Sequence, residues 1–102
     1  MDNILNINNP KYLATKIAEE FKSKRLKLNI TQVELAKKSG VSVGSLKRFE
    51  LKSEISLKNL LKLAVILDLA DYFFNITKLE DQQSIDDIIK SKKKSRKRAS
   101  RK

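Results

Sequence analysis

The stretch from residue 31 to residue 50, TQVELAKKSGVSVGSLKRFE, constrains the fold more than any other part of the chain. It predicts two short helices joined by a tight turn. Thr31 can cap the first helix, and Glu34, three residues later, completes a capping box. Gly40 stands where the chain needs a left-handed residue to turn, and Ser42 is a cap-type residue for the second helix.

The second of these helices has two different faces. Leu46 and Phe49 lie three residues apart and therefore point the same way, towards a core. Val41, in the turn, is the apolar residue expected to plug it. The other face, directed towards solvent or a ligand, holds Val43, Gly44, Lys47 and Arg48.

This pattern resembles the helix-turn-helix of the Cro and phage-repressor family. Counted from Gln32, the family's small, glycine and apolar positions are filled by Ala36, Gly40, Val41, Leu46 and Phe49. The flanking segments KSKRLKLNITQ and SLKNLLKLAVILDL are also similar to the family, so the resemblance covers roughly residues 15 to 70. It implies an all-α, five-helix lambda-repressor-like domain that binds double-stranded DNA, with the motif at 31–50 and the recognition helix at 42–50.

The rest of the expected domain, residues 10–76, also reads as helix, after a flexible N-terminus over 1–9. Asn9 followed by Pro10 starts a helix that runs to about residue 27. Its apolar stripe is Leu13, Ala14, Ile17, Ala18 and Phe21. A corner follows at residues 28–30, where Asn29 is expected to adopt a left-handed backbone.

Two further helices are expected after the motif. Ser56 caps one over residues 57–67, and its inward side is predicted to be Leu57, Leu60, Leu61, Ala64 and Leu67. The loop before it lacks a glycine turn, which leaves its path and its phosphate contacts open. Residues 68–76 form a short fifth helix. Its apolar residues and the apolar surplus of the preceding helix predict a dimer surface, unless the fifth helix simply closes the core.

The charge is distributed unevenly. The chain has 23 lysines and arginines against 12 acidic residues, and nine of these cations with no acid lie in residues 90–102. The folded part is therefore expected to be nearly neutral, followed by a connector over 77–89 and a disordered basic tail. Non-specific phosphate contacts are expected from Lys92, Lys93, Lys94, Arg96, Lys97, Arg98, Arg101 and Lys102. RNA or an acidic protein would attract the same tail, which could alternatively serve solubility alone.

Several classes of protein are not favoured. The chain contains no cysteine and no histidine, which removes thiolate metal sites, the commonest metal ligand and the commonest general base. No catalytic constellation is visible, so no enzyme, metal or cofactor is expected. No apolar run is long enough for a membrane span, and a cytoplasmic, nucleoid-associated protein is expected.

The resemblance also implies roles for single residues. Gln32 is expected at a backbone phosphate, while Ser42 either binds a phosphate or caps its helix. Val43, Gly44, Lys47 and Arg48 occupy positions that face base edges, although both cations could bind phosphate only. Gly44 either allows a close approach to DNA or has no role. Arg25 and Glu50 are expected to form a structural salt bridge rather than to remain two solvated charges.

The function expected from this resemblance is a sequence-specific transcription regulator, most simply a dimeric repressor. The alternative is an antitoxin that represses its own operon and binds a HipA-type toxin kinase. The segment SLKNLLKLAVIL resembles the fourth helix of such antitoxins. The two functions are compatible with each other.

Overall fold

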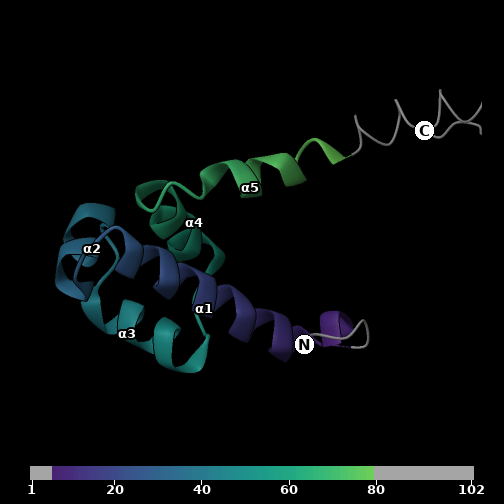
Figure 1. Ribbon diagram of the computed structural model, residues 1–102, viewed down its shortest axis with the longest axis horizontal. Coiled ribbons are helices and arrows are strands. Elements are labelled where there is room, and N and C mark those ends of the chain that lie inside the picture. The colour runs from purple at the N-terminus through teal and green to yellow at the C-terminus, as the bar shows by residue number, and fades with distance from the viewer. Residues whose placement is uncertain (1–5, 80–102) are drawn as a thin grey trace, which may run out of the picture. The chain divides into compact units, whose positions relative to one another are not determined.

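The computed structural model describes residues 6–79, and within them the chain forms helices and no strand (Figure 1). The elements in order are η1 (Asn6–Asn8), α1 (Pro10–Lys27), α2 (Gln32–Ser39), α3 (Val43–Lys52), α4 (Leu57–Ile66) and α5 (Ala70–Ile76). The all-α, five-helix prediction is confirmed. The described residues divide into two compact units, residues 6–70 and 71–79.

The first helix begins and ends where local chemistry requires. Asn9 is its N-cap, and its Oδ1 accepts hydrogen bonds from the backbone N–H groups of Lys11 and Tyr12. Pro10 fills the first helical position, where its missing N–H costs nothing. The corner that follows turns at Asn29, whose φ is +60°. The predicted bounds of 10–27 and the left-handed corner are confirmed.

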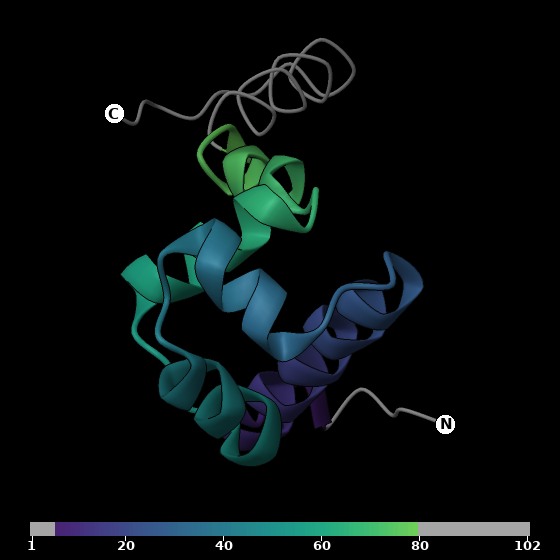
Figure 2. The same cartoon turned by 90° about the vertical axis from the view of Figure 1, so that its left-hand side faces the viewer.

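The α2–turn–α3 segment is built by three caps. In the capping box, the Thr31 N–H donates to Glu34 Oε1 at 2.8 Å and the Glu34 N–H donates to Thr31 Oγ1 at 3.0 Å. Gly40 ends α2 with φ at +81°, a conformation that side chains disfavour. The Oγ of Ser42 accepts from the Ser45 N–H and caps α3. In Figures 1 and 2 the two helices run in different directions from this turn.

The core of the first unit lies between α1, α2, α3 and α4. Helix α2 packs against α3 and α4, and α1 packs against α3. The rings of Phe21 and Phe49 meet edge to face with centroids 5.4 Å apart, a geometry that aromatic pairs prefer. The buried apolar residues are Ala18, Phe21, Leu35, Val41, Leu46, Phe49, Leu63, Ala64 and Leu67. The two helices of the motif are thus held by one continuous core.

Helix α4 presents a different face from the predicted one. Leu57 and Leu61 were expected to point inward, but they are 68% and 38% exposed. Leu63 is fully buried instead, together with Ala64 and Leu67. The prediction was wrong because α4 is apolar nearly all round, so the sequence pattern did not define a unique inward face.

Helix α5 and the residues after it contribute no buried side chain to the described part of the chain. No residue of α5 is buried, and Lys78 Nζ lies 4.9 Å from the centre of the Phe74 ring. The two compact units divide after Ala70, at the start of α5, and the expected domain over residues 10–76 stays a prediction. The connector beyond residue 79 and the basic tail lie outside the described residues. Within residues 6–79, no helix is both long and apolar enough to cross a membrane.

Candidate nucleic-acid interface

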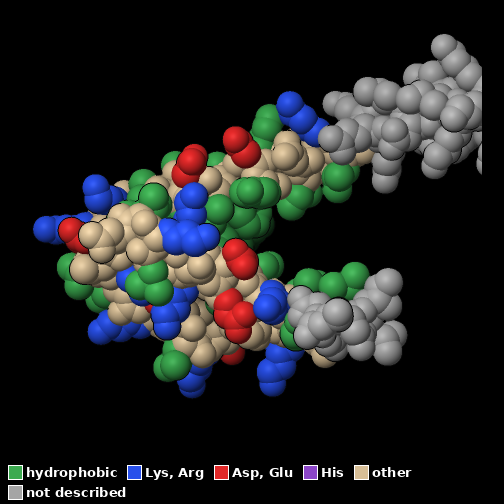
Figure 3. All heavy atoms as spheres, in the orientation of Figure 1, with side chains coloured by type: hydrophobic (Ala, Val, Ile, Leu, Met, Phe, Trp, Pro, Cys, Tyr) green, Lys and Arg blue, Asp and Glu red, His purple; other side chains and the backbone are tan. Residues whose placement is uncertain are grey.

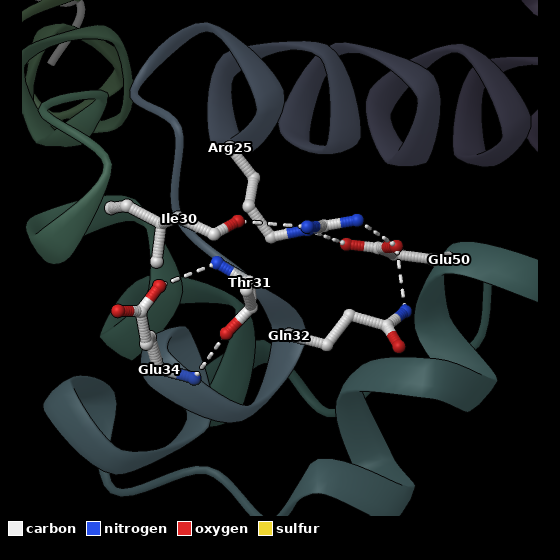
Figure 4. A network of polar contacts seen from close by, with 6 residues as sticks. All are labelled: Arg25, Ile30, Thr31, Gln32, Glu34 and Glu50. Atoms are coloured by element: carbon white, nitrogen blue, oxygen red, sulfur yellow. Dashed lines mark hydrogen bonds and ion pairs between the residues drawn. The ribbon is translucent and has the colours of Figure 1, made fainter.

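The inner side of α3 is anchored by a buried ion pair. Arg25 Nε donates to Glu50 Oε2 at 2.7 Å, and Arg25 Nη2 donates to Glu50 Oε1 at 3.0 Å. The two side chains are only 8% and 6% exposed. Arg25 Nη1 also donates to the Ile30 carbonyl at 2.8 Å (Figure 4). One guanidinium therefore joins α1, the corner before α2 and α3.

Such a pair is tolerated in a core only when its hydrogen-bonding groups are satisfied, because removing two charges from water is costly. Here the guanidinium donates three bonds, and the carboxylate receives a third from Gln32 Nε2 at 2.9 Å. The network links α1, α2 and α3 through their side chains (Figure 4). We infer that it fixes the orientation of α3 in the motif.

Gln32 is therefore already bonded inside the fold. Its amide nitrogen lies against Glu50, while its side chain as a whole is half-buried at the start of α2. An amide carries two N–H groups and an oxygen, so one bond to Glu50 does not exhaust it. The phosphate contact expected of Gln32 stays a prediction, and its structural bond to Glu50 was not anticipated.

The beginning of α2 shows the same kind of local organisation. The Glu34 carboxylate accepts from the backbone N–H and is bonded by the side chain of Thr31, which lowers the pKa of Glu34 below its ordinary value. Lys38, one turn further along, adds a smaller attraction in the same direction. The carboxylate thus stays charged at the helix end where the dipole favours a negative charge.

The outer side of α3 is open to solvent. Val43 and Lys47 lie four residues apart on one strip of the helix, and Gly44 and Arg48 lie on the adjacent strip. All four are exposed. Leu46 and Phe49, on the opposite side, are buried. The structure therefore brings the four residues expected to face DNA together on one exposed surface.

Ser42 stands at the edge of this surface. Its Oγ accepts from the Ser45 N–H at 3.1 Å and donates to Ser45 Oγ at 2.9 Å. Of the two roles expected for Ser42, the structure therefore shows the helix cap. A phosphate contact would add to that role and stays a prediction.

Gly44 has no structural requirement within the fold. A Cβ atom placed on it would meet no other atom within 4 Å, and its φ is not positive. Glycine inside a helix costs about 1 kcal/mol relative to alanine. Within the described part of the chain, nothing explains why glycine stands there, so the expected close approach to DNA stays a prediction.

Arg48 is exposed but not free. Its Nη2 donates to Glu54 Oε1 at 2.6 Å, and the two side chains are 62% and 58% exposed. Both residues line a surface hollow of about 290 Å³ between the end of α3 and the start of α4. The remaining lining residues are Ser45, Ile55, Ser56 and Asn59. The outer surface of α3 thus includes a carboxylate from the following loop.

Two residues of this surface were missed by the sequence-based prediction. Helix α3 runs to Lys52 instead of residue 50, so Leu51 belongs to it and lies four residues after Lys47. Leu51 is 80% exposed. Its four-residue spacing was the available signal for it, whereas nothing in the sequence signalled that Glu54 would reach Arg48.

The described part of the chain carries an excess of positive charge. Residues 6–79 contain 14 lysines and arginines but only 7 aspartates and glutamates. The near balance of charge expected before residue 90 also counts Asp2, Glu80, Asp81, Asp86 and Asp87, which lie outside the described residues. Figure 3 shows cations spread over the visible face with a few acidic side chains among them. The eight tail cations expected at phosphates, Lys92 to Lys102, lie outside the described residues.

A metal site was not expected. Within residues 6–79, no group of three or more acidic, histidine or cysteine side chains could hold a metal ion.

Comparison with known proteins identifies a family. The family model described as "Helix-turn-helix" matches residues 21–72, which is just over half of the chain and includes α2, α3 and α4. No curated protein and no solved structure matches the chain significantly.

Proposed function

Because this chain belongs to the helix-turn-helix family of the Cro/phage-repressor type, whose domain is that of DNA-binding transcription regulators, we propose that it is a sequence-specific repressor. In this proposal α3 enters the major groove of double-stranded DNA, and α2 lies across the backbone. Gln32 and Ser42 contact phosphates, while Val43, Gly44, Lys47 and Arg48 face base edges.

The observation that carries this proposal is the contrast between the two sides of α3. Its inner side is held by Leu46, Phe49 and the buried Glu50, whereas its outer side is solvent-exposed. A helix fixed on one side and open on the other can present side chains at defined positions to a groove. Lysine and arginine suit guanine O6 and N7, and Val43 suits the thymine methyl group.

Selection of bound fragments from a random-sequence DNA library tests this function. The full chain should enrich a defined motif, and gel-shift titration should show tighter binding to the enriched duplex than to a scrambled duplex of equal composition. The K47A variant should lose affinity for the enriched duplex more than for the scrambled one. A wild-type chain that enriches no sequence would overturn the proposal.

The basic tail has a separate role in the proposal. Lys92, Lys93, Lys94, Arg96, Lys97, Arg98, Arg101 and Lys102 would add sequence-independent attraction to phosphates. Deleting residues 90–102 should weaken binding to the enriched and scrambled duplexes alike and flatten the dependence of affinity on salt. A loss confined to the enriched duplex would instead assign the tail a part in sequence recognition.

We propose that the repressor acts as a dimer. Leu57, Leu61 and Val65 recur every fourth residue along α4, and all three are exposed. Such a stripe is complementary to a second copy of itself across a two-fold axis. Two recognition helices would then lie about 34–36 Å apart on the DNA. Replacing Leu61 by glutamate should give a monomer in sedimentation experiments, and an unchanged sedimentation coefficient would reject this surface.

The alternative partner is a HipA-type toxin kinase bound by an antitoxin of this family. Its support is the resemblance of the α4 sequence, and the exposed side chains of Tyr72 and Phe74 on α5 offer a surface for it. Co-purification of a kinase-like protein with the full chain would favour this function. A chain that purifies alone and still binds its operator would favour the stand-alone repressor.

A further inference from the structure

We propose that Glu54 is a specificity-determining residue that acts through Arg48. It would limit the attraction of Arg48 to phosphate while leaving Arg48 able to read a base. This inference rests on the proposed DNA-binding function and assigns a role to a residue outside the helix-turn-helix motif itself.

The fold places Glu54 beside α3 by capping both ends of a short loop. Ser53 ends α3 with a left-handed backbone, at φ +61°, and its N–H donates to the Phe49 carbonyl at 2.8 Å. Ser56 begins α4, and its Oγ accepts from the Asn59 N–H. Glu54 and Ile55 alone lie between these caps. The carboxylate therefore meets Arg48 because of the path of the loop.

The Arg48–Glu54 pair lowers the positive charge on the outer side of α3 but leaves most N–H donors of Arg48 unused. A guanidinium carries five N–H groups, and the structure engages one nitrogen, Nη2, with Glu54. One edge of the fork stays available for two parallel bonds to guanine O6 and N7. Non-specific binding depends mainly on positive charge near phosphates, and Glu54 cancels that charge locally.

Glu54 should affect binding to arbitrary DNA and binding to a matching sequence differently. On arbitrary DNA, Arg48 must leave Glu54 to act as a full cation, and Glu54 is then left unpaired near phosphates. At a matching guanine, Arg48 can keep Glu54 and donate from its free edge. Because both side chains are more than half exposed, water screens the pair and the penalty on non-specific binding is modest. Glu54 should therefore penalise non-specific binding more than specific binding.

The test is the variant E54Q, which keeps an oxygen that can accept from Arg48 and removes only the charge. The probes are the duplex enriched from random DNA by the wild-type chain and its scrambled counterpart. We expect E54Q to bind the scrambled duplex about two- to five-fold more tightly, with a salt slope steeper by about 0.9. Affinity for the enriched duplex should rise less, so the ratio of the two affinities should fall.

Two controls separate this mechanism from a general charge effect. E20Q removes the same charge from an exposed position on α1. In the R48A background, E54Q should strengthen binding to the scrambled duplex less than it does when Arg48 is present. Thermal unfolding should show that E54Q is folded like the wild type, since the pair is exposed.

The outcomes are distinct. A selective wild-type chain whose affinity ratio is unchanged by E54Q would overturn this inference alone. The inference would also be overturned if E54Q strengthened binding to the scrambled duplex equally in the wild-type and R48A backgrounds. A wild-type chain that selects no sequence would overturn the proposed function, and the inference with it.

Discussion

Within residues 6–79, two arginine–glutamate pairs involve helix α3, and their shortest nitrogen–oxygen distances are nearly the same. Arg25 and Glu50 meet at 2.7 Å, and Arg48 and Glu54 meet at 2.6 Å. The first pair is almost fully buried and has additional bonds to Ile30 and Gln32, whereas more than half of each side chain of the second is exposed. The distance therefore does not reveal what each pair contributes.

Burial and the number of partners separate the two pairs. The inner pair cannot exchange its partners with water, so breaking it leaves an uncompensated charge in the core. The outer pair is screened and worth about 0–1 kcal/mol, so a ligand can displace it. We infer that the inner pair positions α3 and that the outer pair adjusts how α3 meets a partner.

The largest expected effect comes from breaking the inner pair. R25A should lower the free energy of unfolding by about 3–5 kcal/mol, because Glu50 would remain buried without its cation. Urea denaturation followed by circular dichroism measures this change. K22A, an exposed lysine on the same helix, should stay within about 0.5 kcal/mol of the wild type. An R25A chain as stable as K22A would show that the inner pair does not anchor α3.

Breaking the outer pair from its arginine side should affect binding rather than stability. R48A should weaken binding to the enriched duplex by about 1–3 kcal/mol, the range of a good base contact. Its free energy of unfolding should change by less than about 1 kcal/mol, since the pair is exposed. K52A is the matched control, and it should weaken binding to enriched and scrambled duplexes equally. Equal losses on both duplexes for R48A would assign Arg48 to phosphate.

The chain's two glycines sharpen the distinction between positions needed by the fold and positions left for a partner. G40A should destabilise the protein by roughly 1–2 kcal/mol, because Gly40 is left-handed. G44A should stabilise it by up to about 1 kcal/mol, because a Cβ there meets no other atom. If the DNA backbone approaches Gly44 closely, G44A should nevertheless bind the enriched duplex less tightly. Unchanged affinity would show that Gly44 serves neither the fold nor DNA.

Much of the inner side of α3 could be predicted from the sequence. Capping boxes, a left-handed glycine and a three-residue apolar spacing are local rules, so Thr31, Gly40 and Leu46 indicated the motif directly. The pairing of Arg25 with Glu50 came from the family resemblance, because no local rule links residues 25 positions apart. Gln32 shows the limit, since its bond to Glu50 depends on how three helices meet.

The outer side and α4 were harder to predict for physical reasons. Ser53 adopts a left-handed backbone where a glycine would be expected, so the path of the loop to Glu54 had no sequence signal. Helix α4 is apolar on most sides, so Leu57 and Leu61 could not be separated from Leu63 by periodicity. In both places tertiary packing decides between local options of similar energy.

The smallest expected effect concerns a third carboxylate that is exposed like Glu54 but bonded to the backbone. The bonds of Glu34 to Thr31 lower its pKa in the folded state. Its contribution to stability is therefore fully present above the pKa of an ordinary glutamate and is lost as pH falls through the lowered folded value. E34Q retains a capping-box side chain but does not titrate. The difference in unfolding temperature between wild type and E34Q should consequently shrink or reverse as the solution is acidified through that range. A difference that stays constant with pH would mean that the charge of Glu34 does not stabilise the helix cap. The bonds of Glu34 to Thr31 would then give it no larger effect on stability than the exposed pairing of Glu54 with Arg48.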